Sequence, residues 1–179
     1  MNVSNRKVHK FIGLVVSVQL LLWTISGIFF SFNKIDQIRG ENYLKSVEQV
    51  IQQKISRISF DEAKEIVIEK TYLKPISVEE ITEEKRGSEF RGRNLPLYKL
   101  SSLDSSDKEV NVYIDPSLGK IVAIRTFEWR LWDLMWGLHI MDWRDRDDIN
   151  NLLLKIFSIL ALISSVTGII LFFRPKSKA

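Results

Sequence analysis

The sequence predicts an integral membrane protein in which two transmembrane α-helices flank a small extracytoplasmic α+β domain, a helix plus an antiparallel sheet. Residues 11–32 carry no charge, and at about 1.5 Å per residue a helix of this length crosses the hydrocarbon core of a bilayer. Residues 152–173 are a second apolar stretch, with Lys155 near its start. The middle of the chain is hydrophilic and alternates in strand-like fashion, which predicts the folded domain between the two spans.

The first apolar stretch also has features of a cleaved signal peptide, because the basic residues Arg6, Lys7 and Lys10 precede it. It is, however, longer than the usual apolar region of about 7–15 residues in such peptides. Ser31, Phe32 and Asn33 offer no small-x-small cleavage site. We therefore expect an uncleaved anchor.

Basic residues lie outside both predicted spans, in residues 1–10 and in the tail 174–179. By the positive-inside rule both termini are expected in the cytoplasm, which places residues 33–126 on the opposite side. The net charge of +4 mostly reflects these two ends, so it does not indicate nucleic-acid binding. The chain has no cysteine, so its outer domain cannot rely on disulfides.

Four strands and one helix are expected in residues 33–126. Ser59 and Glu62 form a capping box for a helix that should end near Leu73, before Pro75. Alternating apolar residues then predict strands at 76–81, 97–100, 110–114 and 121–126, with a charged loop at 83–96 and a turn at 115–120. No phosphate loop, cysteine nucleophile or recognisable serine–histidine pair points to an independent hydrolase or transferase.

Three segments of this domain, FDEAKEIV, LYKL and VNVYIDPSLGKIVAI, resemble a PepSY domain. The flanking RKVHKFIGL and VTGIILFFRP resemble the helices of PepSY-associated transmembrane proteins. The resemblance implies a bacterial inner-membrane protein with a periplasmic domain. It also implies a non-catalytic accessory module that docks a partner protein or membrane complex, as in PepSY domains that inhibit peptidases. The edge of the small sheet would be one contact surface, through strand addition.

Residues 127–151 are expected to form an aromatic interfacial helix followed by a polar break. His139 and four tryptophans recur at helical spacing and would make one stripe at the lipid headgroups: Trp129, Trp132, Trp136 and Trp143. The acidic residues after this stripe are expected to lie at a solvated interface, with Asp148 capping the second span.

Small residues recur on one face of each predicted span, and we expect these faces to pack together or against another subunit. They are Gly13, Ser17, Thr24, Gly27 and Ser31 in the first span, and Ser158, Ala161, Ser165 and Gly168 in the second. The spans also share a local similarity, TISGI against SVTGI, which we interpret as packing chemistry and not as a true repeat.

The two histidines, His9 and His139, suggest an alternative function. Imidazole is a common axial ligand of haem iron, and Gly13 beside His9 would leave room for the macrocycle. Some PepSY-associated membrane proteins are similar to haem-binding reductases linked to iron and siderophore uptake, so the resemblance implies that the chain could be a b-type haem subunit of a membrane redox system. The two histidines would lie roughly 30 Å apart across the bilayer, so each would need a partner ligand from an oligomer. Otherwise His9 is an interfacial hydrogen-bonding residue and His139 a member of the aromatic belt.

Overall fold

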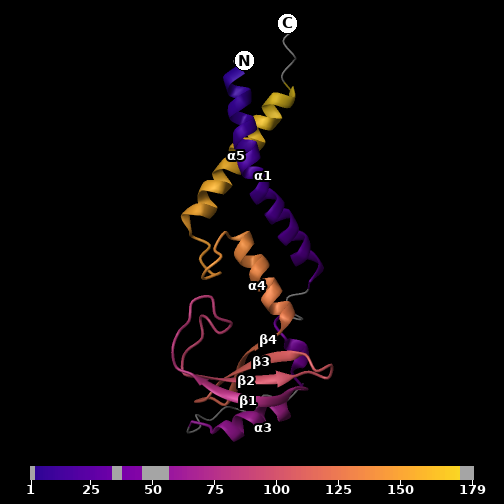
Figure 1. The fold of residues 1–179 in the computed structure, drawn as a ribbon, viewed down its shortest axis with the longest axis vertical. Helices are drawn as coiled ribbons and strands as arrows, with labels where there is room; N and C mark the ends of the chain where they lie inside the picture. Colours follow the sequence, from indigo (N-terminus) through magenta and orange to yellow (C-terminus); the bar gives the residue numbers. More distant parts are fainter. Residues whose placement is uncertain (1–2, 34–37, 46–56, 174–179) are drawn as a thin grey trace. The chain divides into compact units, whose positions relative to one another are not determined.

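The computed structural model describes residues 3–33, 38–45 and 57–173. The chain divides into two compact units, Ser31–Leu134 and the remainder, Met1–Phe30 with Met135–Ala179. Figure 1 shows the helices and strands of both. The basic tail 174–179 lies outside the described residues, as does the side chain of Arg6.

The unit Ser31–Leu134 contains a four-stranded antiparallel sheet in the order β1-β2-β3-β4. Its strands are β1 (Lys74–Ile81), β2 (Leu97–Leu103), β3 (Glu109–Asp115) and β4 (Lys120–Arg125). Helix α3 (Phe60–Lys70) covers one face of this sheet, as Figure 1 shows. The helix, the four strands and the turn before β4 confirm the expected helix-plus-antiparallel-sheet architecture.

The capping box predicted at the start of α3 is confirmed. Ser59 Oγ accepts a hydrogen bond of 3.2 Å from the backbone N–H of Glu62, whose carboxylate accepts one of 2.6 Å from the backbone N–H of Ser59. The helix ends at Lys70, earlier than expected. Thr71 is already extended and forms a β-bridge with Leu44, so long-range pairing ends the helix before Pro75 is reached.

The core of this unit lies between α3 and the sheet. Ala63 and Val67 are the buried residues of α3, and they face alternate side chains of the strands, including Leu100 and Val112. This alternation arises because successive strand residues point to opposite faces of a sheet. The hydrophobic core therefore follows the pattern visible in the sequence.

Helix α4 (Phe127–His139) begins in this unit, where the Thr126 hydroxyl accepts a 3.2 Å hydrogen bond from the backbone N–H of Trp129. The helix ends at His139, and Met141 has a φ of 57°. Trp143 therefore lies beyond the helix, and the expected continuous stripe from Trp129 to Trp143 is wrong at its last member. A right-handed helix cannot continue through a residue of positive φ.

The polar break that follows is organised around Asp142. Its carboxylate accepts hydrogen bonds from four backbone N–H groups, at 3.1–3.3 Å, those of Arg144, Asp145, Asp147 and Asp148. The expected cap at Asp148 is wrong, because the side chain of Asn151 accepts the 2.8 Å hydrogen bond from the backbone N–H of Leu154. Asn151 immediately precedes α5 (Leu152–Phe173), so it occupies the N-cap position.

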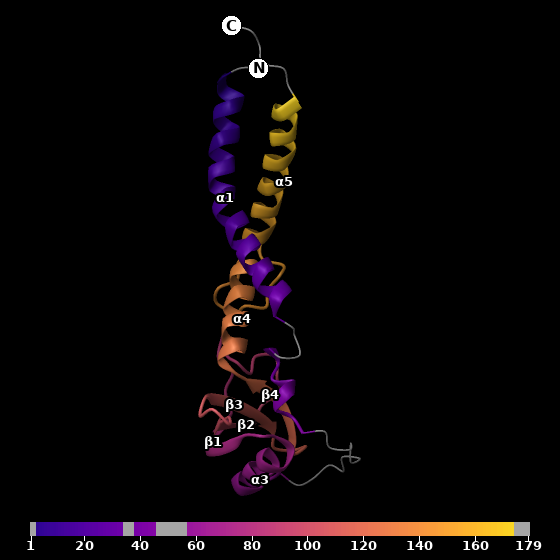
Figure 2. The same ribbon diagram turned by 90° about the vertical axis from the view of Figure 1, so that its right-hand side faces the viewer.

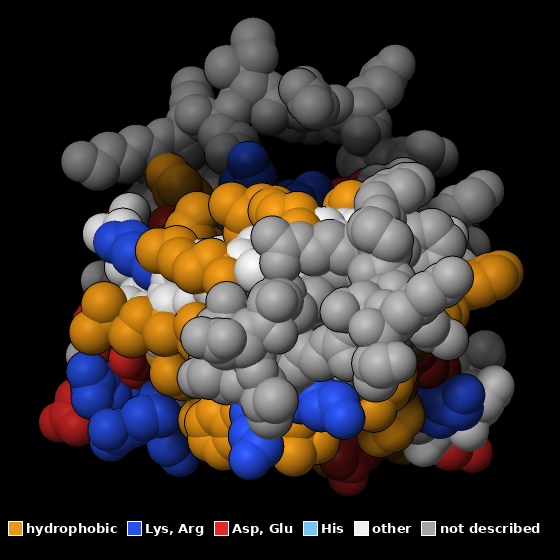
Figure 3. All heavy atoms as spheres, turned by 90° about the horizontal axis from the view of Figure 1, so that it is seen from above, with side chains coloured by type: hydrophobic (Ala, Val, Ile, Leu, Met, Phe, Trp, Pro, Cys, Tyr) orange, Lys and Arg blue, Asp and Glu red, His pale blue; other side chains and the backbone are white. Residues whose placement is uncertain are grey.

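Helices α1 (Val3–Phe32) and α5 form most of the other unit, and Figures 1 and 2 show them crossing. Both are long and apolar enough to span a membrane, over Lys7–Phe32 and Leu152–Ile170. Large hydrophobic side chains such as Phe11, Leu14 and Leu162 are at least 65% exposed. Seen from above, much of the described surface in view is hydrophobic (Figure 3). A lipid environment would solvate such a surface.

The faces by which α1 and α5 approach each other are only partly those of the predicted small-residue stripes. An added Cβ at Gly13 would lie 3.7 Å from Ser164 Oγ, and one at Gly168 would lie 3.7 Å from His9 Cε1. Ala161 is buried, as are Val16, Gln19 and Ser26 on α1. The remaining predicted small residues of α1 and two of those of α5 are exposed within the chain: Ser17, Thr24, Gly27, Ser31, Ser158 and Ser165.

Candidate functional site

His9 is bonded to the opposite transmembrane helix. Its Nδ1 lies 2.8 Å from the hydroxyl oxygen of Thr167 on α5. That hydroxyl also lies 2.7 Å from the carbonyl oxygen of Ile163 and 3.1 Å from that of Ser164. A hydroxyl has one proton to donate, and carbonyl oxygens can only accept. With that proton donated to one of the two carbonyls, the Thr167 oxygen is assigned as the acceptor of a proton on Nδ1 of His9.

His139 has an equivalent partner. Its Nδ1 lies 2.7 Å from the Oγ of Ser26, which is buried on α1. Ser26 Oγ lies 2.8 Å from the carbonyl oxygen of Leu22 and 3.1 Å from that of Trp23. With the hydroxyl proton of Ser26 donated to one of these carbonyls, Ser26 Oγ is assigned as the acceptor of a proton on Nδ1 of His139. In this assignment each imidazole donates from Nδ1, which leaves Nε2 as the ring nitrogen available to a metal.

The end of α4 that carries His139 is held against α1 by two further hydrogen bonds. The indole N–H of Trp23 donates to the carbonyl oxygen of His139 at 2.7 Å, and the amide of Gln19 donates to that of Leu138 at 3.3 Å. The last carbonyl groups of a helix lack partners within it, so these side chains complete the end of α4. They also fix the backbone position of His139.

Aromatic rings surround the His139 imidazole. The centroids of Phe30, Trp136 and Trp23 lie 5.7, 6.3 and 6.4 Å from its own, and the Trp136 ring is stacked on it. Burial among these groups lowers the pKa of His139. The environment therefore favours the neutral imidazole, the form that binds a metal.

The two hydroxyl partners occupy corresponding positions in the two similar segments of the spans. Ser26-Gly27 in TISGI matches Thr167-Gly168 in SVTGI. In the structure each of these hydroxyls bonds one of the two histidines. The matched residues therefore perform the same local task, which gives the packing interpretation of this similarity a specific content. The similarity was the sequence signal that could have identified Ser26 and Thr167.

The two imidazoles cannot bind one metal ion within a single chain. Ser26, the partner of His139, follows His9 by 17 residues on the continuous helix α1, which is roughly 25 Å along its axis. Among the described residues neither Nε2 has a hydrogen-bond partner, so each could provide one axial ligand to its own haem. Gly13 does not provide the expected open space, because Ser164 packs against it.

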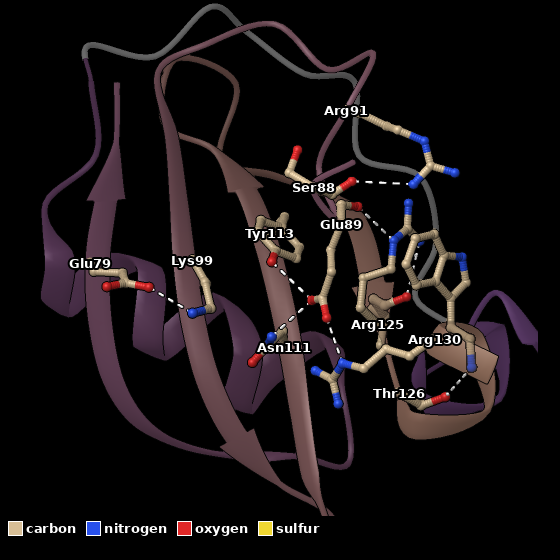
Figure 4. Close-up of polar contacts among 12 residues, drawn as sticks. Glu79, Ser88, Glu89, Arg91, Lys99, Asn111, Tyr113, Arg125, Thr126 and Arg130 are labelled. Carbon is tan, nitrogen blue, oxygen red and sulfur yellow. Dashed lines mark hydrogen bonds and ion pairs between the residues drawn. The ribbon is translucent and has the colours of Figure 1, made fainter. Parts of the chain in front are cut away.

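A second polar cluster lies in the unit Ser31–Leu134, around Glu89. Its carboxylate accepts hydrogen bonds from Arg130 Nε at 2.5 Å, Asn111 Nδ2 at 2.9 Å and the Tyr113 hydroxyl at 3.0 Å. Figure 4 shows the three side chains converging on it. Burial alone would raise the pKa of Glu89, but these donors outweigh it and lower the pKa.

Sequence reasoning missed this cluster, because Glu89 lies in the loop between β1 and β2 and no local pattern distinguishes it. The same is true of Asp133, which is buried on α4 and forms an ion pair with Arg91 of that loop. Both acids bind arginines more than 40 positions away, at Arg130 and Arg91. Only the packing of the loop against β4 and α4 brings these groups together.

Comparison with known families gives one match. The sequence pattern described as the PepSY-associated TM region matches residues 6–179, almost the whole chain. The chain belongs to the PepSY-associated transmembrane family. With its two apolar helices, this membership identifies a membrane protein and confirms the expected resemblance. Searches of curated proteins and of solved structures each found no match.

Within this PepSY-associated protein, the match includes both histidine–hydroxyl pairs and the whole sheet. His9 and Thr167 lie near the two ends of the matched region, while Ser26 and His139 lie inside it. The segments first noted for their resemblance, RKVHKFIGL and VTGIILFFRP, thus contain one complete pair between them. Family membership supports a membrane-associated accessory role. The two histidine–hydroxyl pairs are groups in this chain that are suited to binding a metal.

Proposed function

We propose that the chain is a membrane accessory subunit that holds b-type haem through His9 and His139. The observation that carries this proposal is that both imidazoles are hydrogen-bonded through Nδ1 to a hydroxyl on another helix. Metal-binding histidines have this arrangement, in which a hydrogen bond at one ring nitrogen orients the other toward the metal and fixes the tautomer.

The residues around each histidine have distinct tasks in this proposal. Thr167 and Ser26 orient the two rings, while Trp23 and Gln19 hold the backbone at His139. Trp136 and Phe30 exclude water from the second ring and favour its neutral form. Bound haem would supply one-electron redox chemistry.

Each haem would need a further protein ligand from another subunit, because His9 and Ser26, the partner of His139, lie roughly 25 Å apart along α1. A second copy of this chain has the same two histidines to offer. The exposed faces of α1 and α5 leave surface for such a contact. We place both termini in the cytoplasm of a bacterial inner membrane and the sheet in the periplasm, on the basis of the basic flanks.

The absorption spectrum of the full-length protein, purified from haem-replete cells, tests this proposal. We expect a Soret band that decreases in His9→Ala and in His139→Ala and is absent from the double variant. Lys10→Ala, next to His9 on α1, is the matched control and should retain the full band. A colourless wild-type protein, or a band unchanged in the double variant, would overturn the proposal.

A second candidate is a docking module without a cofactor. The observation that favours it is that Ser17, Thr24 and Gly27 are exposed on α1, where a partner helix could approach closely. The edge strand β1, which pairs only with β2 among the described residues, offers a second surface.

Crosslinking in native membranes tests this second candidate. Gly27→Leu should abolish a crosslink that wild type forms with its partner, because the added side chain separates the helices. Val18→Phe adds bulk on another exposed part of α1 and should leave the crosslink intact. Recovery of only the monomer from wild type, or equal effects of both variants, would count against docking through this face.

A further inference from the structure

A cavity of about 540 Å³ lies in the unit Ser31–Leu134, between the segment that precedes α3 and strand β4. Its volume is within the range of about 300–1,000 Å³ that is typical of small-molecule sites. Gly40 allows the segment to approach β4, because a Cβ there would lie 2.7 Å from the side chain of Ile124. The lining of the cavity includes Arg39, Glu41, Leu44, Arg93, Ile121, Arg125 and Trp129.

The cavity has an excess of positive charge. Three arginines line it, Arg39, Arg93 and Arg125, against one acidic residue, Glu41. Three other arginines of the same unit form ion pairs, Arg57 with Glu80, Arg91 with Asp133 and Arg130 with Glu89. Within the described parts of the chain, none of the three cavity arginines has such a partner. The cavity therefore concentrates the unpaired guanidinium groups of this unit.

Arg125 is held in place for binding. Its Nε donates to the carbonyl oxygen of Glu89 at 2.9 Å, as Figure 4 shows, and its Nη1 donates to the carbonyl oxygen of Ile124 at 3.1 Å. Its guanidinium carbon lies 4.2 Å from the centroid of the Trp129 ring. Stacking and backbone contacts fix the plane of the group, and Nη2 has no partner among the described residues.

Burial and a neighbouring positive charge disfavour the charged form of Arg125. Burial and the neighbouring Arg93 lower its pKa to about 10. The carboxylate of Glu89 opposes this lowering only in part, and its oxygens accept from Arg130, Asn111 and Tyr113. A bound anion would remove the repulsion between Arg125 and Arg93.

We propose that this cavity binds the phosphate group of a small molecule or lipid. Three guanidinium groups against one carboxylate leave two positive charges, which match a phosphate monoester dianion. The planar guanidinium fork suits its oxygens. Leu44 and Ile121 provide apolar surface for the carbon part of the ligand. The phosphate could come from a soluble ester or from a phospholipid headgroup.

Titration of the full-length protein with glycerol phosphate, in phospholipid-free detergent, tests the soluble source by calorimetry. The variant R39Q/R93Q removes the two exposed arginines without disturbing the packing of Arg125 on Trp129. We expect its dissociation constant to rise at least about tenfold, since hydrogen bonds to charged groups are among the strong ones. The control K74Q/K120Q loses the same charge at exposed positions outside the cavity and should bind like wild type.

Mass spectrometry of phosphatidylglycerol retained by the detergent-purified protein tests the lipid source. If a headgroup occupies the cavity, wild type and K74Q/K120Q should retain this lipid and R39Q/R93Q should lose it. Selective loss of either probe in R39Q/R93Q supports the proposal and identifies the source. Binding of neither probe by wild type, or equal binding by both variants, would overturn it. The result is independent of the haem proposal, because no histidine is altered.

Discussion

Ser26 and His139 are 113 positions apart in the sequence, yet Ser26 Oγ lies 2.7 Å from Nδ1 of His139. Thr167 and His9 form the corresponding pair at 2.8 Å, with 158 positions between them. In both pairs the hydroxyl also contacts the carbonyl oxygen four residues before it, Leu22 for Ser26 and Ile163 for Thr167. The carbonyl contact within each helix thus favours the tautomer in which a histidine on another helix carries its proton on Nδ1.

Replacing Ser26 with alanine should shift the tautomer of His139. The change removes the acceptor at Nδ1, and a hydrogen bond of about 1 kcal/mol corresponds to roughly a fivefold preference between tautomers. Nitrogen NMR of the two imidazoles measures the tautomer populations. The His9 signals should remain unchanged.

Ser17→Ala and Thr24→Val are the matched controls for this experiment. Both hydroxyls bond only carbonyl groups of their own helix among the described residues, those of Leu14 and Leu20. Neither control should alter either imidazole. An unchanged His139 spectrum in Ser26→Ala would contradict the assigned tautomer.

Glu89→Gln should destabilise the sheet-containing unit and reduce its pH dependence. The folded-state pKa of Glu89 is lowered, so its stabilisation is complete above about pH 4.5, the carboxyl's ordinary value, and is lost as pH falls through the lower folded-state pKa. We expect a loss of about 1–3 kcal/mol at pH 7 and a smaller difference between variants in acid. Urea unfolding at several pH values measures both.

Glu79→Gln provides the comparison for Glu89. Its ion pair with Lys99 spans 2.7 Å, but the Glu79 side chain is 61% exposed. Exposed pairs of this kind contribute about 0.2–1 kcal/mol, so this variant should differ little from wild type. If both variants lost the same free energy of unfolding, the Glu89 cluster would stabilise the unit no more than a surface ion pair does.

Gly40→Ala should destabilise the same unit by more than Gly92→Ala does. Both glycines have positive φ, 75° and 71°, so both alanines incur a backbone cost of about 1 kcal/mol. Only at Gly40 would the new Cβ clash, at 2.7 Å from Ile124, whereas nothing lies within 4 Å at Gly92. We expect about 1–3 kcal/mol more for Gly40→Ala, measured by urea unfolding. Equal losses would contradict the close approach to β4.

Single-cysteine labelling should determine the topology, since the chain has no cysteine of its own. Ser106→Cys lies at an exposed turn between β2 and β3 and should react in intact cells with a reagent that does not cross the inner membrane. Ser177→Cys, in the basic tail, should react only after that membrane is permeabilised. The reverse pattern would contradict the proposed orientation.

The sequence by itself determined the elements whose causes are local. Length and hydrophobicity were sufficient for α1 and α5, alternation for β1 to β4, and Ser59 with Glu62 for the start of α3. Local pattern failed where a distant contact intervened. The Leu44–Thr71 bridge ended α3 early, and the turn at Met141 separated Trp143 from its stripe.

Only the tertiary structure decided which side chains meet. The small residues formed a stripe in sequence, but packing within the chain buried Val16 and Ser26 and left Ser17 and Thr24 exposed. A helical period defines faces but not which face meets a neighbour, since that depends on where two helices cross. For the same reason His9 and His139 were visible as candidates from the start. Their hydroxyl partners emerged only when distant segments were brought together.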